Sequence, residues 1–466
     1  MSDNFISTTI EEACEIHDSR RKPIKKGDRI EGKYPYYGAS GIADYIRDYE
    51  FDGTYLLLSE DGDNLKTQKT PVAFLAKGKF WVNNHAHVLK AKEGNLTEYI
   101  CYALQVADIK SYISGSTRPK ITQSDMRMIP FNLPPLPEQK AIAHILGTLD
   151  DKIELNRQMN QTLEAMAQAL FKSWFVDFDP VIDNALAAGN QIPEALQARA
   201  EKRKALLDRH SEGGTTEESP QKGAPLLYSN PALAALFPSS FEYNETLDKW
   251  IPEGWEVKSV GDLATVVGGG TPSTSVDEYY TDNGIAWLSP KDLSGYEWKY
   301  ISKGAKDITE LGLKKSSAKM MPSGTVVFSS RAPIGYVAIA ENELCTNQGF
   351  KSLIPNKEVP SEYLYQFLKA NVEQIESIAS GSTFKEVSGS AIKGFSILKP
   401  SKEILARFAM IIESGNKKGL VNQKETETLT QLRDTLLPQL ISGKVRVPEG
   451  VIEKVGVPRE IIEQMN

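Results

Sequence analysis

The sequence predicts an α+β protein made of two similar halves, each a mixed α/β domain followed by one long helix. Three observations predict it. The chain has 466 residues and is 40% hydrophobic, which is more than one ordinary core organises. It resembles itself 266 residues further on, and each copy ends in a stretch where apolar residues recur at helical spacing. We therefore expect two domains and two helices related by an approximate two-fold axis.

The repeat is clearest from a Gly-Ser-Thr loop onward. Gly115-Ser116-Thr117 recurs as Gly381-Ser382-Thr383, and the apolar positions then stay in step without a gap. The matched positions include Ile121 with Val387, Met126 with Ile392, Ile142 with Phe408, Asn156 with Asn422, Leu163 with Leu429, Leu170 with Leu436 and Trp174 with Leu440. Chance does not keep apolar positions in step over such a length, so the two halves share a fold.

Upstream of that loop the copies match more loosely, at three anchors. A turn and an apolar strand at 52–59 resemble 323–330, and a short apolar-faced helix at 99–104 resembles 363–368. Between them, residues 84–87 (NHAH) correspond to 347–350 (NQGF). Small insertions separate the anchors, as expected for domains that share a scaffold and differ in their loops.

The pattern divides the chain into six parts. Mixed α/β domains occupy 1–134 and 251–399, and spacer helices follow at 135–176 and 400–446, with the helical pattern of the second reaching about 442. Prolines before each helix stop the preceding strand and suit a helix start. We expect a partly ordered connector at 177–250, with a charged helical patch at 194–209 and a Gly/Ser/Thr/Glu-rich run at 211–219, and a C-terminal tail at 447–466.

The two helices carry a heptad seam that predicts an antiparallel coiled coil. Asn156 and Asn422 occupy the same place in the seam, where a buried asparagine fixes the register at some cost in stability. The residues expected to pair the helices are Leu149, Ile153, Asn156, Leu163, Leu170, Trp174, Asn422, Leu429, Leu436 and Leu440.

Composition excludes several classes of protein. Its net charge of −7 is unlike that of a simple basic nucleic-acid binder. The three cysteines lie far apart, so they form neither a disulfide framework nor a C-x-x-C metal site. We find neither a leader-like N-terminus nor an apolar run long enough for a membrane span, and we expect a cytoplasmic protein.

Several motifs resemble those of the specificity subunit of a type I restriction-modification enzyme, over nearly the whole chain. They are LPPLPEQ at 133–139, LFKSWFVDFDP at 170–180, LFP at 236–238, IPEGWEV at 251–257 and LLPQLISG at 436–443. The first copy departs from the family pattern because it lacks the Pro-x-Gly-Trp opening, which blurs the start of its fold.

The resemblance implies a chain that does no chemistry and binds no cofactor or metal itself. Each α/β domain would read one half of a bipartite, asymmetric sequence in the major groove of double-stranded DNA, and the helices would set the spacing. A helix of 40 residues is about 60 Å long, and one turn of B-DNA is about 34 to 36 Å. Two modification subunits would transfer methyl groups from S-adenosylmethionine, and two restriction subunits would use ATP and magnesium. Apolar helix faces left free by the pairing would hold the modification subunits.

Because the domains are nearly neutral, with 18 basic and 18 acidic residues in 1–134 and 15 and 17 in 251–399, their DNA contacts must be local. The Gly-Ser-Thr loop offers backbone donors, hydroxyls and cations. Arg331 is the only arginine in 251–399 and the best candidate for a guanine contact. The candidate DNA-binding residues are Tyr37, Ser40, Ser59, Asn84, His85, Ser116, Thr117, Arg118, Lys120, Thr271, Ser273, Ser329, Arg331, Asn347, Gln348, Ser382, Thr383 and Lys385.

Each candidate also has a purely structural interpretation as a turn, a solvated face or a loop hydrogen bond. His85 and His87 could share a strand face and bind zinc, but a third ligand is not evident in the sequence. Asp125 with residues 138–140 imitates a nuclease pattern, and residues 132–135 imitate a methyltransferase motif in the wrong order. The remaining alternatives are an enzyme with its own nuclease or methyltransferase, and a stand-alone tandem scaffold or regulatory module that binds DNA or protein.

Overall fold

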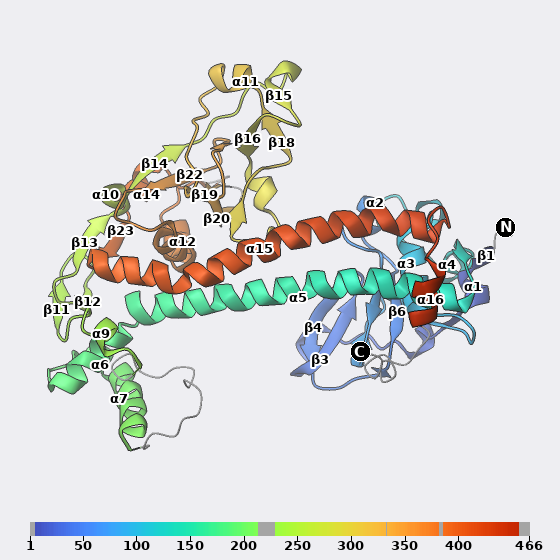
Figure 1. The fold of residues 1–466 in the computed structure, drawn as a ribbon, viewed down its shortest axis with the longest axis horizontal. Helices are drawn as coiled ribbons and strands as arrows, with labels where there is room; N and C mark the ends of the chain where they lie inside the picture. Colours follow the sequence, from blue (N-terminus) through green and yellow to red (C-terminus); the bar gives the residue numbers. More distant parts are fainter. Residues whose placement is uncertain (1–4, 213–228, 332, 382–384, 456–466) are drawn as a thin grey trace. The chain divides into compact units, whose positions relative to one another are not determined.

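The computed structural model describes residues 5–212, 229–331, 333–381 and 385–455 (Figure 1). The chain forms two compact units. Unit 1 combines residues 1–156 with 425–466, and unit 2 spans residues 157–424. Within the described ranges, no helix is both long enough and apolar enough to cross a membrane.

Unit 1 is built on a four-stranded antiparallel sheet. Its strand β6 (Tyr55–Ser59) is buried at every position, as its run of leucines predicts. Gly53 precedes it with φ of +121°, a backbone conformation that strains residues with a side chain. In sheet order the strands are β2 (Cys14–Ile16), β9 (Ala86–Ala91), β6 and β7 (Ala73–Ala76).

A second sheet of unit 1 packs onto the first through aromatic rings. Phe51 stacks on Phe80 with ring centroids 5.3 Å apart, and Tyr55 of β6 meets both rings edge-on. In sheet order this sheet contains β4 (Gly41–Ile46), β3 (Glu31–Gly38), β8 (Lys79–Val82) and β5 (Phe51–Asp52). The short elements around the sheets are β1 (Ile6–Thr9), which pairs with β10 (Pro130–Leu133), and α1 (Ile10–Ala13), α2 (Asn64–Thr67), α3 (Thr97–Val106) and α4 (Gln123–Arg127).

Unit 2 repeats this architecture, which confirms the predicted two-copy fold. Its main sheet has the order β14 (Ala264–Gly268), β22 (Lys351–Pro355), β19 (Val326–Ser330), β20 (Ile334–Ala340) and β17 (Tyr300–Ile301). The first four strands correspond in order to β2, β9, β6 and β7. The surrounding elements recur as β13 (Glu256–Ser259) paired with β23 (Ser396–Lys399), α10 (Val260–Leu263), α12 (Ser361–Ala370) and α14 (Gly389–Gly394).

Even the helix caps recur. Thr9 and Glu12 form a capping box at the start of α1, and Ser259 and Asp262 form one at the start of α10. The copies differ most in the second sheet, which in unit 2 contains β15 (Tyr280–Thr281), β18 (Lys306–Ile308), β16 (Ile285–Leu288) and β21 (Cys345–Thr346). Unit 2 also contains the short helices α11 (Glu310–Lys314) and α13 (Val372–Ser377).

Two long helices follow the domains, as predicted. They are α5 (Leu136–Phe175) and α15 (Lys402–Ile441). The second ends before the expected limit of 446, because Gly443 adopts φ of +72° and its N–H bonds the carbonyl of Leu440. A short helix, α16 (Glu449–Val455), lies in the segment predicted to be a tail.

The helices pair in antiparallel fashion in both units. In unit 1 Arg433 bonds Asp150 at 2.8 Å, and Asn156 donates to Glu425 at 3.0 Å. In unit 2 Asn160 donates to the carbonyl of Gly419 at 2.8 Å. Among the predicted pairing residues, Ile153, Asn156, Trp174, Asn422 and Leu440 are buried, and Leu149, Leu163, Leu170, Leu429 and Leu436 are half-buried.

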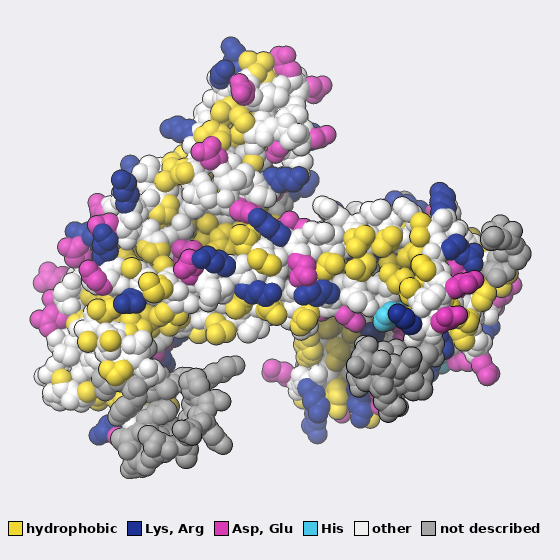
Figure 2. Space-filling model, viewed as in Figure 1, with side chains coloured by type: hydrophobic (Ala, Val, Ile, Leu, Met, Phe, Trp, Pro, Cys, Tyr) yellow, Lys and Arg dark blue, Asp and Glu magenta, His cyan; other side chains and the backbone are white. Residues whose placement is uncertain are grey.

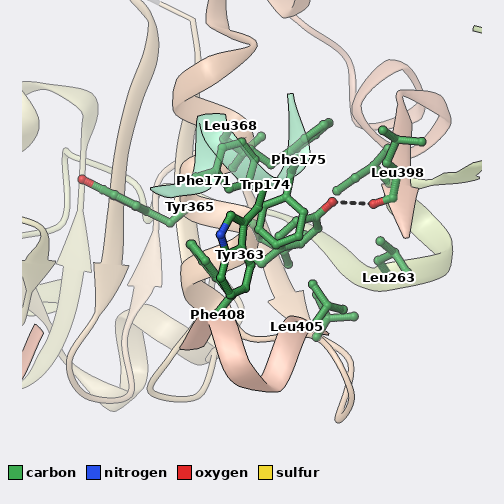
Figure 3. Packing of buried hydrophobic residues seen from close by; sticks show 14 of the residues in the cluster. Phe171, Trp174, Phe175, Leu263, Tyr363, Tyr365, Leu368, Leu398, Leu405 and Phe408 are labelled. Carbon is green, nitrogen blue, oxygen red and sulfur yellow. Dashed lines mark hydrogen bonds between the residues drawn. The ribbon is translucent and has the colours of Figure 1, made fainter. Parts of the chain in front are cut away.

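The C-terminal end of α5 enters the core of unit 2 (Figure 3). Trp174 lies edge-on to Phe237, 4.9 Å between centroids, and also contacts Phe408 of α15. Tyr363 of α12 donates its hydroxyl hydrogen to the carbonyl of Leu398, which ties the same core to β23. Trp174 therefore joins the helix pair to the domain core as well as pairing the helices.

The segment predicted to be a connector is largely folded and belongs to unit 2. It contains α6 (Asp179–Ala188), α7 (Gln197–Glu212), α9 (Pro231–Ala234) and a hairpin of β11 (Phe241–Asn244) and β12 (Lys249–Pro252). Arg199 pairs with Asp179 at 2.7 Å, and Arg203 pairs with Asp183. Because β12 crosses residue 250, the expected boundary cuts a strand. Most of the run at 211–219 lies outside the described residues.

Candidate nucleic-acid interface

Two loops meet at the same place in both units. In unit 1 the strand-end loop comprises residues 60–63, which follow β6. In unit 2 the strand-end loop begins at Arg331, which follows β19. The Gly-Ser-Thr loop comprises 114–120 in unit 1 and 380–386 in unit 2. Ile121 N bonds Glu60 O at 2.8 Å, and Val387 N bonds Ser330 O at 3.0 Å. Isolated backbone bridges join Asp61 to Lys120 and Arg331 to Glu386, so the two loop pairs are structural equivalents.

In unit 1 the loops are held together by ion pairs. Asp61 accepts from Arg118 at 2.9 Å and lies 2.9 Å from Nδ1 of His85. Lys120 pairs with Glu60 at 3.1 Å. Asp61, His85 and Arg118 line one hollow with Ser40 from the β3–β4 turn, so three of the predicted DNA-binding residues converge there.

A buried network of charged side chains lies beneath the two loops of unit 1. His87 Nδ1 lies 2.6 Å from Asp18, and Arg21 bonds both Asp18 and Glu60. Burial alone would raise the pKa of Asp18, but hydrogen bonds from His87, the Val88 N–H and Gln123 hold that pKa below its ordinary value. The pKa of Glu60 is also lowered, because bonds from Arg21 and Lys120 outweigh burial. Both carboxylates therefore stay ionised beneath the loops.

In unit 2 the corresponding pair is Arg331 with Glu386, at 3.5 Å. Lys351 bonds the other carboxylate oxygen of Glu386 at 3.0 Å. Lys385 is exposed beside Glu386, and Ser382 and Thr383 of the same loop lie outside the described residues. Two further candidates, Thr271 and Gln348, are joined by a hydrogen bond that the Thr271 hydroxyl donates. Ser273, two residues after Thr271, is exposed.

Two of the predicted residues are buried, and a third is half-buried. Ser59 is buried and donates to the carbonyl of Ala39. Ser329 is also buried, donates to Pro333 O at 2.9 Å and accepts from Tyr336 N at 2.8 Å. Both hydroxyls are bonded within the domain, so these serines hold the turns beside the loops. Tyr37 packs its half-buried ring against Phe74 and Phe80.

The structure also corrects the alignment between the copies by one residue. Asn83 Oδ1 accepts from His85 N at 2.7 Å, and Asn347 Oδ1 accepts from Gly349 N at 2.8 Å. Asn347 therefore corresponds to Asn83, and the exposed Asn84 corresponds to the exposed Gln348. Ser116, Thr117, Arg118 and Lys120 are also exposed, and His85 is half-buried.

The two histidines do not share a ligand set. His87 is buried against Asp18 and the carbonyl of Ile121, whereas His85 pairs with Asp61. Among the described residues, no group of three His, Cys, Asp or Glu side chains could hold a metal ion.

The sequence places Asp61 just past a strand end, where it could reach a groove, but does not indicate its pairing with Arg118, and it gives no direct indication of Lys351 or Glu386. Because DNA is anionic, the charge of a candidate loop predicts its cations as contacts and says little about the carboxylates paired with them. Position is the only signal for Glu386, which adjoins Lys385. Figure 2 shows basic and acidic side chains interspersed on the visible face of each unit, consistent with nearly neutral domains.

The fold and the paired loops define a protein with two copies of one α/β domain, each followed by a long helix. Comparison with known proteins gives its class. The family model described as the type I restriction modification DNA specificity domain matches residues 3–165 and 252–440. The chain belongs to this family. Its function is that of a specificity subunit, which supplies DNA recognition, and the methyltransferase and restriction activities of such systems lie in other subunits.

Individual relatives agree. The chain is 30% identical over 460 residues to the type I restriction enzyme HindI specificity subunit of Haemophilus influenzae, covering 96% of this chain and 92% of that protein. It is 44% identical over 192 residues to the MjaIX specificity subunit of Methanocaldococcus jannaschii, covering 39% of this chain and 44% of the relative. A crystal structure of the type I S subunit from M. genitalium shares the fold, with a TM-score of 0.54 at 17% identity over 95% of this chain and 97% of that chain.

Proposed function

We propose that the loop pair of each unit contacts one half of a bipartite, asymmetric DNA target through the major groove. One observation carries this proposal: the same two loops meet at the same place in both units and present different polar side chains. A shared frame with different exposed groups suits two half-sites of different sequence. The proposed contacts are Ser40, Asn84, His85, Ser116, Thr117, Arg118 and Lys120 in unit 1, and Thr271, Ser273, Arg331, Asn347, Gln348, Ser382, Thr383 and Lys385 in unit 2.

The position of the positive charges supports a DNA contact confined to the loops. The loops hold Arg118 and Lys120 in unit 1 and Arg331 and Lys385 in unit 2, within domains that are nearly neutral overall. Each cation that neutralises a phosphate releases counterions, so DNA binding must weaken as salt rises. With few cations per loop pair, we expect a modest salt slope from this chain, with the remaining affinity supplied by the partner subunits.

We also propose that two modification subunits dock on equivalent faces of the long helices. Leu155 is 52% exposed, and Val421, at the repeat-equivalent position, is 56% exposed. Met166 and Leu432 are a second equivalent pair, and both are exposed. Unit 1 thus carries Leu155 and Leu432, and unit 2 carries Val421 and Met166. Exposed apolar residues kept at matched positions support two copies of one partner.

Membership of the family supports a proposal for the remaining partners and cofactors. We place S-adenosylmethionine on the modification subunits, and ATP and magnesium on two restriction subunits, with assembly in the cytoplasm where the DNA lies.

Sequencing of methylated adenine in cells that carry the complete system tests the DNA proposal. Deleting the gene should remove methylation from one bipartite motif. Replacing Ser116, Thr117 and Arg118 together by alanine should change or abolish recognition of one half only. Lys110→Ala, a surface change outside the loops of the same domain, is the matched control. Intact recognition of both halves by the triple variant would refute the assignment of these loops.

A further inference from the structure

The loop pair carries the same bridge in both units with its charges exchanged. In unit 1 the strand-end position is Asp61 and its backbone partner is Lys120. In unit 2 the strand-end position is Arg331 and its partner is Glu386. Both units nevertheless contain one arginine paired with a carboxylate across the two loops. The arginine comes from the Gly-Ser-Thr loop in unit 1 and from the strand-end loop in unit 2.

The geometry in unit 1 separates an exposed arginine from a sheltered carboxylate. The side chain of Arg118 is 68% exposed, and that of Asp61 is 15% exposed. Asp61 bonds Nη2 of Arg118 at 2.9 Å and is itself fixed by His85 Nδ1 at 2.9 Å. A guanidinium has five N–H donors, so this pairing leaves donors for another acceptor.

Unit 2 also pairs an arginine with a carboxylate across the loops, but here both side chains are partly exposed, 35% for Arg331 and 37% for Glu386. Arg331 and Glu386 are 3.5 Å apart through Nη1 and Oε2. Lys351, whose side chain is mostly buried, holds Oε1 of Glu386 at 3.0 Å. Glu386 is therefore anchored by Lys351 through one oxygen and faces Arg331 with the other. In unit 1 His85 and Arg118 instead contact the same oxygen of Asp61, Oδ2.

We propose that Arg118 and Arg331 are equivalent base-reading residues, one for each half-site, and that Asp61 and Glu386 are the positioning residues that orient them. This inference rests on the proposed DNA contact of the two loop pairs. Arginine recognises guanine through two parallel bonds to O6 and N7, which requires a fixed guanidinium plane. A carboxylate that holds the guanidinium before DNA arrives lowers the cost of ordering it on binding.

Variants that lack the carboxylates distinguish a positioning role from a purely structural one. Removing an acid near DNA reduces repulsion from phosphates, so binding to unrelated DNA should strengthen or stay unchanged. Discrimination among bases should fall, because the guanidinium is no longer held in one orientation. A carboxylate that merely supported the fold would instead weaken binding to all DNA when removed.

The test uses the assembled complex with the modification subunits and compares Asp61→Asn, Glu386→Gln, Arg118→Ala and Arg331→Ala. Binding and methylation are measured on the target and on targets with one base pair changed in either half. We expect Asp61→Asn and Arg118→Ala to lose about tenfold discrimination at the same base pair of one half. Glu386→Gln and Arg331→Ala should do so in the other half, and neither acid variant should weaken binding to unrelated DNA.

Two different failures are distinguishable. If the arginine variants keep full discrimination, the loops do not read DNA and the proposed contact itself is wrong. If the arginine variants lose discrimination and the acid variants do not, the contact stands and the positioning role is refuted. Thermal unfolding of each variant, with Lys110→Ala as the control, identifies a folding defect. Should an acid variant misfold, Asp61→Glu or Glu386→Asp replaces it. Each of these changes shifts the carboxylate and should therefore reorient the arginine. Unchanged base discrimination in these folded variants would count against the positioning role.

Discussion

Asn422 Nδ2 donates a hydrogen bond to Asn160 Oδ1 across the paired helices of unit 2, at 2.9 Å. Asn160 in turn donates to the carbonyl of Gly419 at 2.8 Å. A Cβ placed on Gly419 would lie 3.7 Å from Asn160 Oδ1, an ordinary van der Waals contact, so the helices approach closely here without requiring glycine. The amides thus mark one register of α5 against α15, at a seam position that apolar side chains would otherwise fill.

Replacing both amides by leucine should stabilise the chain. In Asn160→Leu/Asn422→Leu the polar groups are removed together, so apolar packing replaces them, and the free energy of unfolding should rise by about 1 to 2 kcal/mol. Asn160→Ala alone should lower it by about 1 kcal/mol, since two bonds are lost. Urea titration measures both. A double variant less stable than the native chain would show that the amides stabilise the pair outright.

Truncating Trp174 should be among the most destabilising single changes in unit 2. The ring is 1% exposed and contacts Phe237 and Phe408, so Trp174→Ala leaves a cavity and should cost about 3 to 5 kcal/mol of unfolding free energy. Met166→Ala, on the exposed side of the same helix, should cost less than about 0.5 kcal/mol. Similar losses in the two variants, measured by denaturant titration, would contradict the packing described for the end of α5.

Asp18 should make the stability of unit 1 sensitive to acid. Its pKa in the folded chain lies below the ordinary 3.8, so its contribution is complete above that pH and is lost as the pH falls through the folded-state pKa. Asp18→Asn should lower stability by about 2 kcal/mol at pH 7 and remove part of this acid sensitivity. Hydrogen exchange of peptides from β6 and β9 at pH 7 and pH 3 measures the effect. Equal pH dependence in variant and native chain would exclude the role.

The cysteines should resist alkylation in the folded chain. Burial raises the pKa of Cys14, Cys101 and Cys345 to about 12 each, so almost no thiolate is present at neutral pH. Iodoacetamide at pH 7.5 should modify none of them within an hour and all three after unfolding in guanidinium, as counted by intact-mass spectrometry. Rapid modification of the native chain would show that a thiol is accessible.

The exposed apolar pairs on the helices should control how many modification subunits bind. Leu155→Ser and Val421→Ser should each leave the stability of the chain within about 0.5 kcal/mol and remove one modification subunit, and the double variant should remove both. Native mass spectrometry of the assembled complex counts the subunits. Gln161→Ser, a polar exposed position of α5, is the matched control. Two bound subunits in the double variant would place docking elsewhere.

The two-copy fold could be predicted because apolar spacing records it. The 266-residue spacing aligns Pro130 of β10 with Ser396 of β23, the first residues of two equivalent strands. The one-residue error at Asn84 arose because insertions change the spacing upstream, and hydrogen bonds of Asn83 and Asn347, not residue identity, set the true match. The burial of Ser59 and Ser329 could not be predicted either, since a serine at a strand end is expected to be exposed until its hydrogen-bond acceptor is known.

Unit 1 combines two segments that are far apart in the chain, so during protein synthesis its core is completed later than that of unit 2. Leu437, Leu440 and Ile441 belong to the same apolar core as Ile10 and Leu56, so a core that begins near residue 10 is completed only after residue 441 has been translated. The ribosome adds about 5 to 20 residues per second, and residues 157–424 separate the two parts. For tens of seconds the nascent first domain therefore lacks part of its core, whereas unit 2 is contiguous and complete earlier. A chain stopped between residues 424 and 437 would contain all of unit 2 and lack part of the core of unit 1.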